Sequence, residues 1–321
     1  MRAIVVKEPG AASMLVEAEV EEPVAGPGDV LIEVAAAGVN RADVLQREGH
    51  YPSPPGSPAW PGLEVSGTVL EAPELSGFAV GDAVCALLGG GGYAERVAVP
   101  AGQVLPVPVG IDLVDAAGLP EVVATVWSNV FLLADLRAGE TLLVHGGSSG
   151  IGTMAVQLGR VFGARVAVTA RSSSKLEACA ELGADILIDY TVDDFVERIR
   201  AEAGGADVIL DVVGGDYLSR NVRALAVNGR IANIASRGGT SSLDLNALMM
   251  KRGTIRSTSL RARPADEKAA IVASVRENVW PVIENGAVHP VIGARFPFAE
   301  AAAAHELMES SSHIGKILLE V

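Results

Sequence analysis

Apolar and polar residues alternate along the first third of the chain, with glycine and proline between the alternating stretches. VLIEVAAAG (30–38) has the alternation of a half-buried strand. In SPPGSPAWPG (53–62) each proline removes a backbone donor and restrains the residue before it, which excludes regular structure. The pattern predicts an irregular β-rich domain over residues 1–121.

The middle of the chain changes to continuous apolar runs that alternate with helical stretches. Glu121 to Leu136 has helical spacing, and strands are predicted at 141–145, 165–169, 186–189, 206–213 and 230–235. Helices are predicted between these strands, and such a succession is typical of a parallel sheet covered on both faces. We therefore expect an α/β, Rossmann-type domain over 122–258, with the number of units that dinucleotide binding needs.

The C-terminal segment predicts a long helix from Pro264 to Glu284 that Pro281 kinks or ends early. A short helix, AEAAAAHELMES, and a last strand, KILLEV, follow it. These elements are too few for a core of their own. We expect them to pack on the N-terminal β domain, so that 1–121 and 259–321 form one discontinuous domain.

Charge and composition reduce the range of partners, locations and metal sites that the chain can have. The 321 residues carry a net charge of −14, which disfavours nucleic acid and anionic membrane surfaces as partners. The most apolar stretch, 122–134, is shorter than the roughly 20 residues of a membrane span. Cys85 and Cys179 form no CxxC pair, which favours a reducing, cytoplasmic location and leaves too few thiolates for a four-cysteine zinc site.

A glycine-rich loop follows the predicted strand TLLVH and opens a helix. Backbone amides must approach a pyrophosphate closely, and the helix N-terminus attracts the anion. An ordinary glycine-rich turn is the alternative, but a strand before the loop and a helix and second strand after it favour a dinucleotide site. The expected cofactor-binding residues of this loop are Gly147, Ser148, Ser149, Gly150, Ile151 and Gly152.

The end of the next strand indicates which dinucleotide binds. An NAD site places an acidic residue there, about 20 residues beyond the glycines, for the ribose hydroxyl. Here Thr169-Ala170 is followed by Arg171, Ser172 and Lys175, which can hold a 2′-phosphate. The alternative is that the two cations are solvated and the serines cap the next helix. We expect NADPH as the cofactor.

Several ordered blocks resemble those of one family. GDVLIEVAAAGVNRADVLQREGHYPSPPG (28–56), PGLEVSGTV (61–69), VGDAV (80–84), GGYAE (91–95), VHGGSSGIG (144–152), ADVILDVVGG (206–215) and HIGKILLEV (313–321) are similar to blocks of the zeta-crystallin-like quinone oxidoreductases. These are zinc-free members of the medium-chain dehydrogenase/reductase superfamily, and the resemblance covers nearly the whole chain. It implies a GroES-like β domain beside the Rossmann domain. Ser149, where many relatives have glycine, matches a subgroup related to mammalian inducible quinone reductases.

The resemblance implies roles for individual residues. Asn40 is expected to meet the nicotinamide ribose or the substrate, Thr125 the nicotinamide side, and Tyr190 the adenosine 2′-phosphate. Tyr51 is expected to line the substrate pocket. The structural alternatives are an Asx turn for Asn40, a threonine of an amphipathic helix for Thr125, a buried strand-end tyrosine for Tyr190 and a surface tyrosine for Tyr51. Asp211 and Ser236 follow strands whose C-terminal ends border a cofactor crevice, so cofactor contact is expected there too.

Metal ligands are not expected. Zinc-dependent relatives have a cysteine where this chain has Asn40, and a histidine where it has Leu63 before Glu64. Arg41 and Asp43 are expected to fix their loop, and His145 to position its strand end. The other four histidines, at positions 50, 289, 305 and 313, are expected at the surface.

Together these features predict a zinc-independent oxidoreductase in which hydride passes from NADPH to a quinone, with Tyr51 and Ser149 as candidate donors beside Asn40. Two alternatives remain open: an enoyl or enone reductase, and an NADPH-binding protein with little turnover. The family also implies a homodimer or homotetramer.

Overall fold

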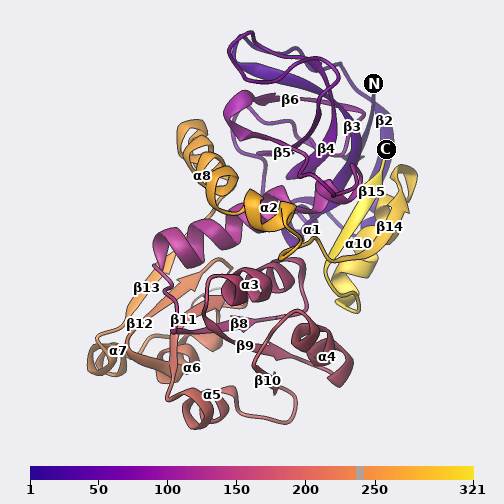
Figure 1. The fold of residues 1–321 in the computed structure, drawn as a ribbon. Coiled ribbons are helices and arrows are strands. Elements are labelled where there is room, and N and C mark those ends of the chain that lie inside the picture. Colours follow the sequence, from indigo (N-terminus) through magenta and orange to yellow (C-terminus); the bar gives the residue numbers. More distant parts are fainter. Residues whose placement is uncertain (236–239, 241) are drawn as a thin grey trace. The chain divides into compact units, whose positions relative to one another are not determined.

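The computed structural model describes residues 1–235, 240 and 242–321, and its contacts divide the chain into two units (Figure 1). The first unit comprises Met1–Ala124 and Leu260–Val321, and the second comprises Thr125–Ser259. Each unit buries its own apolar core, one around Ile32, Val65 and Leu319 and the other around Leu143, Ile188 and Ile209.

The second unit is built on a six-stranded sheet in which all neighbouring strands are parallel. Its strand order is β10-β9-β8-β11-β12-β13. The strands are β8 (Thr141–His145), β9 (Arg165–Ala170), β10 (Ile186–Asp189), β11 (Ala206–Asp211), β12 (Leu225–Asn233) and β13 (Thr254–Ser257). Every residue of β8 is buried, including the polar Thr141 and His145 at its two ends, as expected for a strand of a parallel sheet that is covered on both faces. The predicted α/β fold is confirmed.

Helices connect these strands: α3 (Gly150–Val161), α4 (Ser173–Glu181), α5 (Phe195–Ala203), α6 (Tyr217–Ala224) and α7 (Leu245–Lys251). The chain steps outward from β8 to β10, returns to β11 beside β8, and then steps outward the other way to β13. Parallel crossovers are right-handed, so α3 and α4 cover one face and α5 and α6 the other. The reversal between β8 and β11 is the switch point where such sheets bind ligands, at the carboxyl ends of the strands.

The segment before β8 forms a helix, as predicted, but its geometry changes midway. It begins as α2 (Pro120–Val126) and continues as a π-helix over Trp127–Leu133. The Trp127 ring stacks on Phe131 at 4.8 Å between centroids and meets Phe162 at 5.4 Å. The stretch Asp115–Leu133 is long and apolar enough to cross a membrane, but most of it is buried within the protein, as in a core helix.

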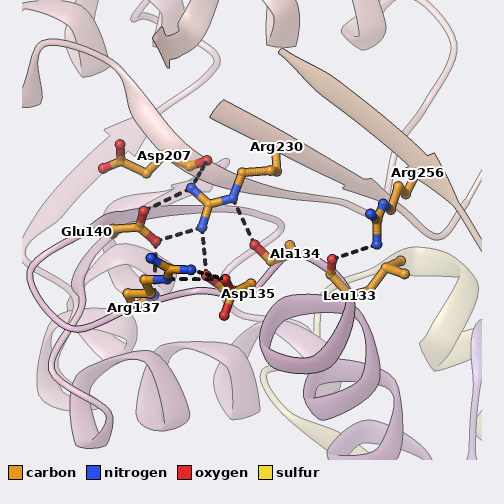
Figure 2. Close-up of polar contacts among 8 residues, drawn as sticks. All are labelled: Leu133, Ala134, Asp135, Arg137, Glu140, Asp207, Arg230 and Arg256. Carbon is orange, nitrogen blue, oxygen red and sulfur yellow. Dashed lines mark hydrogen bonds and ion pairs between the residues drawn. The ribbon is translucent and has the colours of Figure 1, made fainter. Parts of the chain in front are cut away.

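Two arginines of the sheet bind the carbonyl groups at the end of this π-helix (Figure 2). Arg230 donates to the carbonyl oxygens of Ala134 and Asp135, and Arg256 donates to that of Leu133. Arg230 also forms a two-pronged ion pair with Glu140, with N–O distances of 2.9 and 2.7 Å. The guanidinium of Arg230 therefore joins the end of the π-helix to Glu140, the residue before β8.

The first unit contains a seven-stranded sheet. Its main path runs β14-β15-β3-β4-β5-β7, and β6 pairs with β3. The strands are β3 (Asp29–Val39), β4 (Glu64–Glu71), β5 (Ala83–Leu87), β6 (Arg96–Pro100), β7 (Val104–Pro106), β14 (Ile292–Pro297) and β15 (Lys316–Glu320), and β1 (Arg2–Val6) pairs separately with β2 (Leu15–Glu19). The last strand of the chain, β15, lies antiparallel to β3 with Ile317 opposite Val39. The C-terminus thereby completes the N-terminal sheet.

Helices of this unit are α1 (Arg41–Arg47), α8 (Ala265–Asn278), α9 (Trp280–Glu284) and α10 (Ala301–Ser310), with 3-10 turns at Ala12–Met14, Ala101–Gln103, Asp115–Gly118 and Phe298–Glu300. The helix predicted from Pro264 to Glu284 is present but broken at Val279. Pro281 lies in the first turn of the second piece, α9, where its missing N–H costs nothing. The predicted effect of this proline is confirmed.

His305 corrects one prediction, because it is fully buried rather than exposed. It lies on the face of α10 that also carries Ala301, Ala304 and Met308, a helical spacing that the sequence displays. Its Nε2 pairs with the Tyr93 hydroxyl at 3.1 Å. Burial, with a smaller effect from Arg47, lowers the pKa of the imidazole from 6.5 to about 3.

This buried histidine predicts acid sensitivity. Between pH 6.5 and about 3 the unfolded chain binds one proton more at this position, so the free energy of unfolding falls as the pH drops, by up to about 1.4 kcal/mol per pH unit. In His305→Gln the amide still pairs with Tyr93 but does not ionise, so urea unfolding at pH 6.5 and at pH 4.5 should show a smaller loss than in the wild type. His289→Gln, at an exposed position, is the control. Equal losses in the wild type and His305→Gln would contradict this assignment.

Candidate functional site

The glycine loop of the second unit has the close packing expected of a phosphate cradle. It joins β8 to α3 at the carboxyl edge of the sheet. A Cβ on Gly147 would lie 2.7 Å from the Cβ of Val168, and one on Gly152 would lie 2.3 Å from the carbonyl oxygen of Gly146. Gly146 itself has a φ of +68°, which favours glycine. The loop therefore admits almost no side chains at these positions.

The N-terminus of α3 provides donors at this loop. Ser149 is the N-cap, and its hydroxyl oxygen accepts a hydrogen bond of 3.0 Å from the N–H of Gly152. The amides of Gly150 and Ile151, in the first turn, have no acceptor within the helix. A 12-residue helix adds a partial positive charge at that end. The residues of the loop fit the pyrophosphate of a dinucleotide.

The end of β9 brings two cations together. Arg171 is exposed, and Lys175 is partly buried one turn into α4. Desolvation, followed by the charge of Arg171, lowers the pKa of the Lys175 ammonium. Ser172 occupies the N-cap position of α4, but its side chain makes no capping hydrogen bond. The alternative in which this serine caps the helix through its hydroxyl is thus not what the structure shows.

Tyr190 lies beside this cationic edge. It directly follows β10, where Asp189 is in register with Ala170 of β9, and its N–H donates to the carbonyl oxygen of Ala170 at 3.1 Å. Its side chain is 40% exposed. The sheet therefore brings Tyr190 and Arg171 to the same edge, as a shared 2′-phosphate site requires.

Asp211, unlike the exposed residues at the ends of β9 and β10, is buried, and its carboxylate is bonded to its own turn. It ends β11 and is fully buried, and its Oδ1 accepts from the N–H groups of Val213 and Gly214, both at 2.9 Å. Its Oδ2 accepts from Asn233 at 3.3 Å. The carboxylate shapes its own turn, and its contact with a cofactor stays a prediction. Ser236 lies outside the described residues.

Thr125 and His145 belong to buried polar networks. The carbonyl oxygen of Thr125 accepts from the Asn129 side chain at 2.9 Å. The His145 ring pairs with Asn221 at 2.8 Å and with Thr169 at 3.1 Å, and burial lowers the pKa of the imidazole. His145 thus fastens the end of β8, in keeping with the expected positioning role.

In the first unit, Asn40 lies between β3 and α1, and Asp43 fixes the backbone there. The buried Asp43 carboxylate accepts from the N–H of Asn40 and from that of Gly62, both at 2.8 Å. Burial raises the pKa of Asp43 to about 6. Arg41 donates to the carbonyl oxygen of Met308 at 2.8 Å. Both side chains fix the loop, as expected.

The Asn40 amide is held by two charged residues for which the sequence predicted no contact with it. Lys316 Nζ donates to Asn40 Oδ1 at 2.8 Å, and Asn40 Nδ2 donates to Glu64 Oε1 at 2.9 Å. Lys316 and Glu64 also pair directly at 2.5 Å, and both are almost completely buried. This arrangement fixes which end of the amide is the acceptor. The sequence signals for this contact are a lysine that opens the apolar run KILLEV and a glutamate beside Leu63.

Tyr51 is held in its proline-rich loop by Arg261. The Arg261 guanidinium lies 5.1 Å from the centre of the Tyr51 ring and donates to the Tyr51 carbonyl oxygen at 3.1 Å. It also donates to Gln46 at 2.6 Å and to the carbonyl oxygen of Gly89 at 2.7 Å. The Tyr51 side chain therefore does not extend freely into solvent, because Arg261 contacts both its ring and its backbone. Arg261 follows the middle domain in sequence, and no local pattern indicated this contact.

Two family models match the chain. The alcohol dehydrogenase GroES-like domain matches residues 26–109, and the zinc-binding dehydrogenase model matches residues 150–275. The first lies in the unit that holds Asn40 and Tyr51, and the second begins at the N-terminus of α3.

Individual proteins match over the full length. The quinone oxidoreductase of Rattus norvegicus is 33% identical over 327 residues, which span 99% of this chain and 97% of the relative. A solved NAD-dependent alcohol dehydrogenase is 30% identical with a TM-score of 0.88, and each chain is covered completely. A mycobacterial protein solved in complex with NADPH is 28% identical, also with a TM-score of 0.88 and complete coverage.

The zinc in the name of one family model does not fit the residues present. Asn40 and Glu64 are already bonded to the Lys316 ammonium, a cation that would lie against any metal ion bound by them. Within the described part of the chain, no group of three histidine, cysteine, aspartate or glutamate side chains is arranged to hold a metal. No step of the chemistry is therefore assigned to a metal.

The Lys316–Glu64 pair predicts a marked non-additivity in stability. Lys316→Met leaves the Glu64 carboxylate buried without its ammonium, which should cost about 3–5 kcal/mol in the free energy of unfolding. Glu64→Gln added to Lys316→Met removes the uncompensated charge and should recover a large part of that loss. Urea unfolding of the two single variants and the double variant measures the coupling. Simple addition of the two single effects would contradict the pairing.

Proposed function

Because the chain belongs to the medium-chain dehydrogenase/reductase superfamily, and within it to the zeta-crystallin-like quinone oxidoreductases, we propose that it reduces quinones by hydride transfer from NADPH without a metal ion. The observation that carries the proposal is the closely packed glycine loop at the N-terminus of α3 together with the cationic end of β9. NADPH supplies the hydride when bound. The protein supplies binding, orientation and protons.

The preference for NADPH rests on the end of β9. Arg171, Ser172 and Lys175 follow the strand, and no acidic residue is there to bind a free ribose hydroxyl. A guanidinium and an ammonium close together favour a doubly charged phosphate. Tyr190 at the same edge adds a ring and a hydroxyl.

The remaining contacts are assigned by analogy with the family. The pyrophosphate is held by Gly147, Ser148, Ser149, Gly150, Ile151 and Gly152. Thr125 and Asn40 contact the nicotinamide end, and Asp211 and Ser236 border the cofactor. Tyr51 lines the substrate pocket, where its ring stacks on a quinone, and Tyr51 and Ser149 act as hydroxyl donors. Ser149 retains its hydroxyl proton for this, because in its capping bond the oxygen is the acceptor.

Without a metal to polarise it, the substrate must already be electrophilic. Quinones meet this requirement through conjugation, and activated enones do so as well. An enoyl or enone reductase is therefore the second candidate, with hydride added to the β-carbon and a proton to the α-carbon. A protein that binds NADPH with little turnover is the third.

Oligomeric state and location complete the proposal. The edge strand β13 has exposed residues, and Leu245, Met249 and Met250 of the preceding helix are largely exposed. An apolar helix beside an open sheet edge favours a homodimer or homotetramer. Both cysteines are free and buried, which supports a cytoplasmic location, and the charge of −14 disfavours nucleic acid and membrane as partners.

Cofactor preference is tested by the double variant Arg171→Asp with Lys175→Ala. Loss of two charge-assisted contacts should raise the KM for NADPH about tenfold to a hundredfold and change that for NADH little. Arg276→Asp with Lys7→Ala, at exposed positions of the first unit, makes the same change in charge and serves as the control. Equal use of NADH and NADPH by the wild type would show the NADPH assignment to be wrong.

Substrate class is tested by following NADPH oxidation with a naphthoquinone, a simple enone and a crotonyl thioester. The proposal predicts the highest kcat/KM for the quinone. A higher value for the enone or thioester would favour the alkene reductase, and no oxidation with any acceptor despite tight NADPH binding would favour the binding protein.

A further inference from the structure

Arg261 joins three separate segments of the first unit beside Tyr51. Its Nε donates to the carbonyl oxygen of Gly89 at 2.7 Å, and its Nη2 donates to Gln46 Oε1 at 2.6 Å and to Ser53 Oγ at 3.1 Å. These acceptors belong to the glycine run 89–92 after β5, to α1 and to the proline-rich loop. Arg261 is only 4% exposed, so its guanidinium is held within the unit by these contacts.

The Tyr51 ring lies against the same guanidinium. Arg261 Cζ is over the ring, 5.1 Å from its centre, and Nη1 donates to the Tyr51 carbonyl oxygen at 3.1 Å. A guanidinium is planar, so it can stack on an aromatic ring while the N–H groups at its edge donate hydrogen bonds. One side chain thereby fixes both the backbone and the ring of Tyr51. Because Arg261 covers one face of the ring, a flat ligand can stack only on the opposite face.

The loop that carries Tyr51 is stiff along the rest of its length. Pro52 follows Tyr51 directly, which restricts the Tyr51 backbone to extended conformations. A Cβ on Gly91 would lie 2.6 Å from Pro58, and Trp60 Nε1 donates to the Gly91 carbonyl oxygen at 3.0 Å. The loop therefore presents Tyr51 in a defined position before a ligand binds, which reduces the entropy lost on binding.

We propose that Arg261 makes Tyr51 a rigid, one-sided stacking surface and thereby selects flat conjugated rings as substrates. This inference rests on the proposed function, in which Tyr51 lines the substrate pocket. A quinone stacks on the tyrosine ring over its whole area, whereas an open-chain enone or a thioester has only a few conjugated atoms to stack. Arg261 acts through Tyr51 and is therefore a positioning residue.

The first test replaces the guanidinium but keeps its charge. An ammonium has no flat face and no fork of donors, so Arg261→Lys loses the stacking on Tyr51. We expect the KM for a naphthoquinone to rise about tenfold and the KM for NADPH to change less than about twofold. Partial unfolding would instead lower the apparent kcat and leave the KM for the quinone unchanged.

Arg263→Lys is the matched control for this variant. It makes the same replacement two positions further along the chain, where the guanidinium pairs with Glu267 at 3.4 Å near the surface. Its KM for the naphthoquinone should equal that of the wild type. A wild-type KM in Arg261→Lys, or the same rise in Arg263→Lys, would overturn the inference.

The second test asks whether Arg261 acts through the Tyr51 ring. Tyr51→Phe keeps the ring and Tyr51→Leu removes it, so adding Arg261→Lys should raise the KM for the naphthoquinone about tenfold in the first background and little in the second. The KM for an open-chain enone should change little in either. Equal rises in the two backgrounds, or an equal rise for the enone, would overturn the inference alone. A wild type inactive with every quinone and enone would instead overturn the proposed function, and this inference with it.

Discussion

The buried ion pair between Lys316 and Glu64 is the interaction on which the arrangement of the first unit depends. It joins β15 to β4 across the end of β3, the strand that lies between them. A buried pair is stable only when its remaining hydrogen-bonding groups are satisfied. Here the ammonium also donates to Asn40 and to the carbonyl oxygen of Val39, and the carboxylate also accepts from Asn40 and from the N–H of Glu121. Asn40 consequently has one defined orientation.

Each unit holds its own candidate site, and the two sites are built from different kinds of group. In the second unit the site is mainly backbone: glycines that exclude side chains, a helix N-terminus and the open carboxyl edge of a parallel sheet. The candidate site of the first unit is mainly buried charge, with Asp43, Glu64, Lys316 and Arg261 each holding a backbone segment or a polar side chain. A backbone cradle suits a phosphate-rich cofactor common to many enzymes, whereas fixed side chains suit the positioning of one substrate.

Patterns that depend on local sequence were predictable. The strands of the parallel sheet follow from apolar runs, the glycine loop from its spacing, and the break near Pro281 from the missing N–H of proline. Contacts between distant residues were not. Lys316 and Glu64 are 252 positions apart, and Arg261 reaches Gln46 across 215. The sequence predicts a surface position for His305 because it shows no spacing to a partner, although its helical spacing with Ala301 and Met308 indicates burial.

The Lys316 ammonium, paired with Glu64, supplies a positive charge beside Asn40, and we propose that reduction therefore needs no metal ion. Quinone reduction after exhaustive dialysis against a chelator, with zinc counted by mass spectrometry, tests this most directly. If no metal is needed, kcat stays unchanged with far less than one zinc per chain. Loss of activity on dialysis, with recovery on adding one equivalent of zinc, would contradict it.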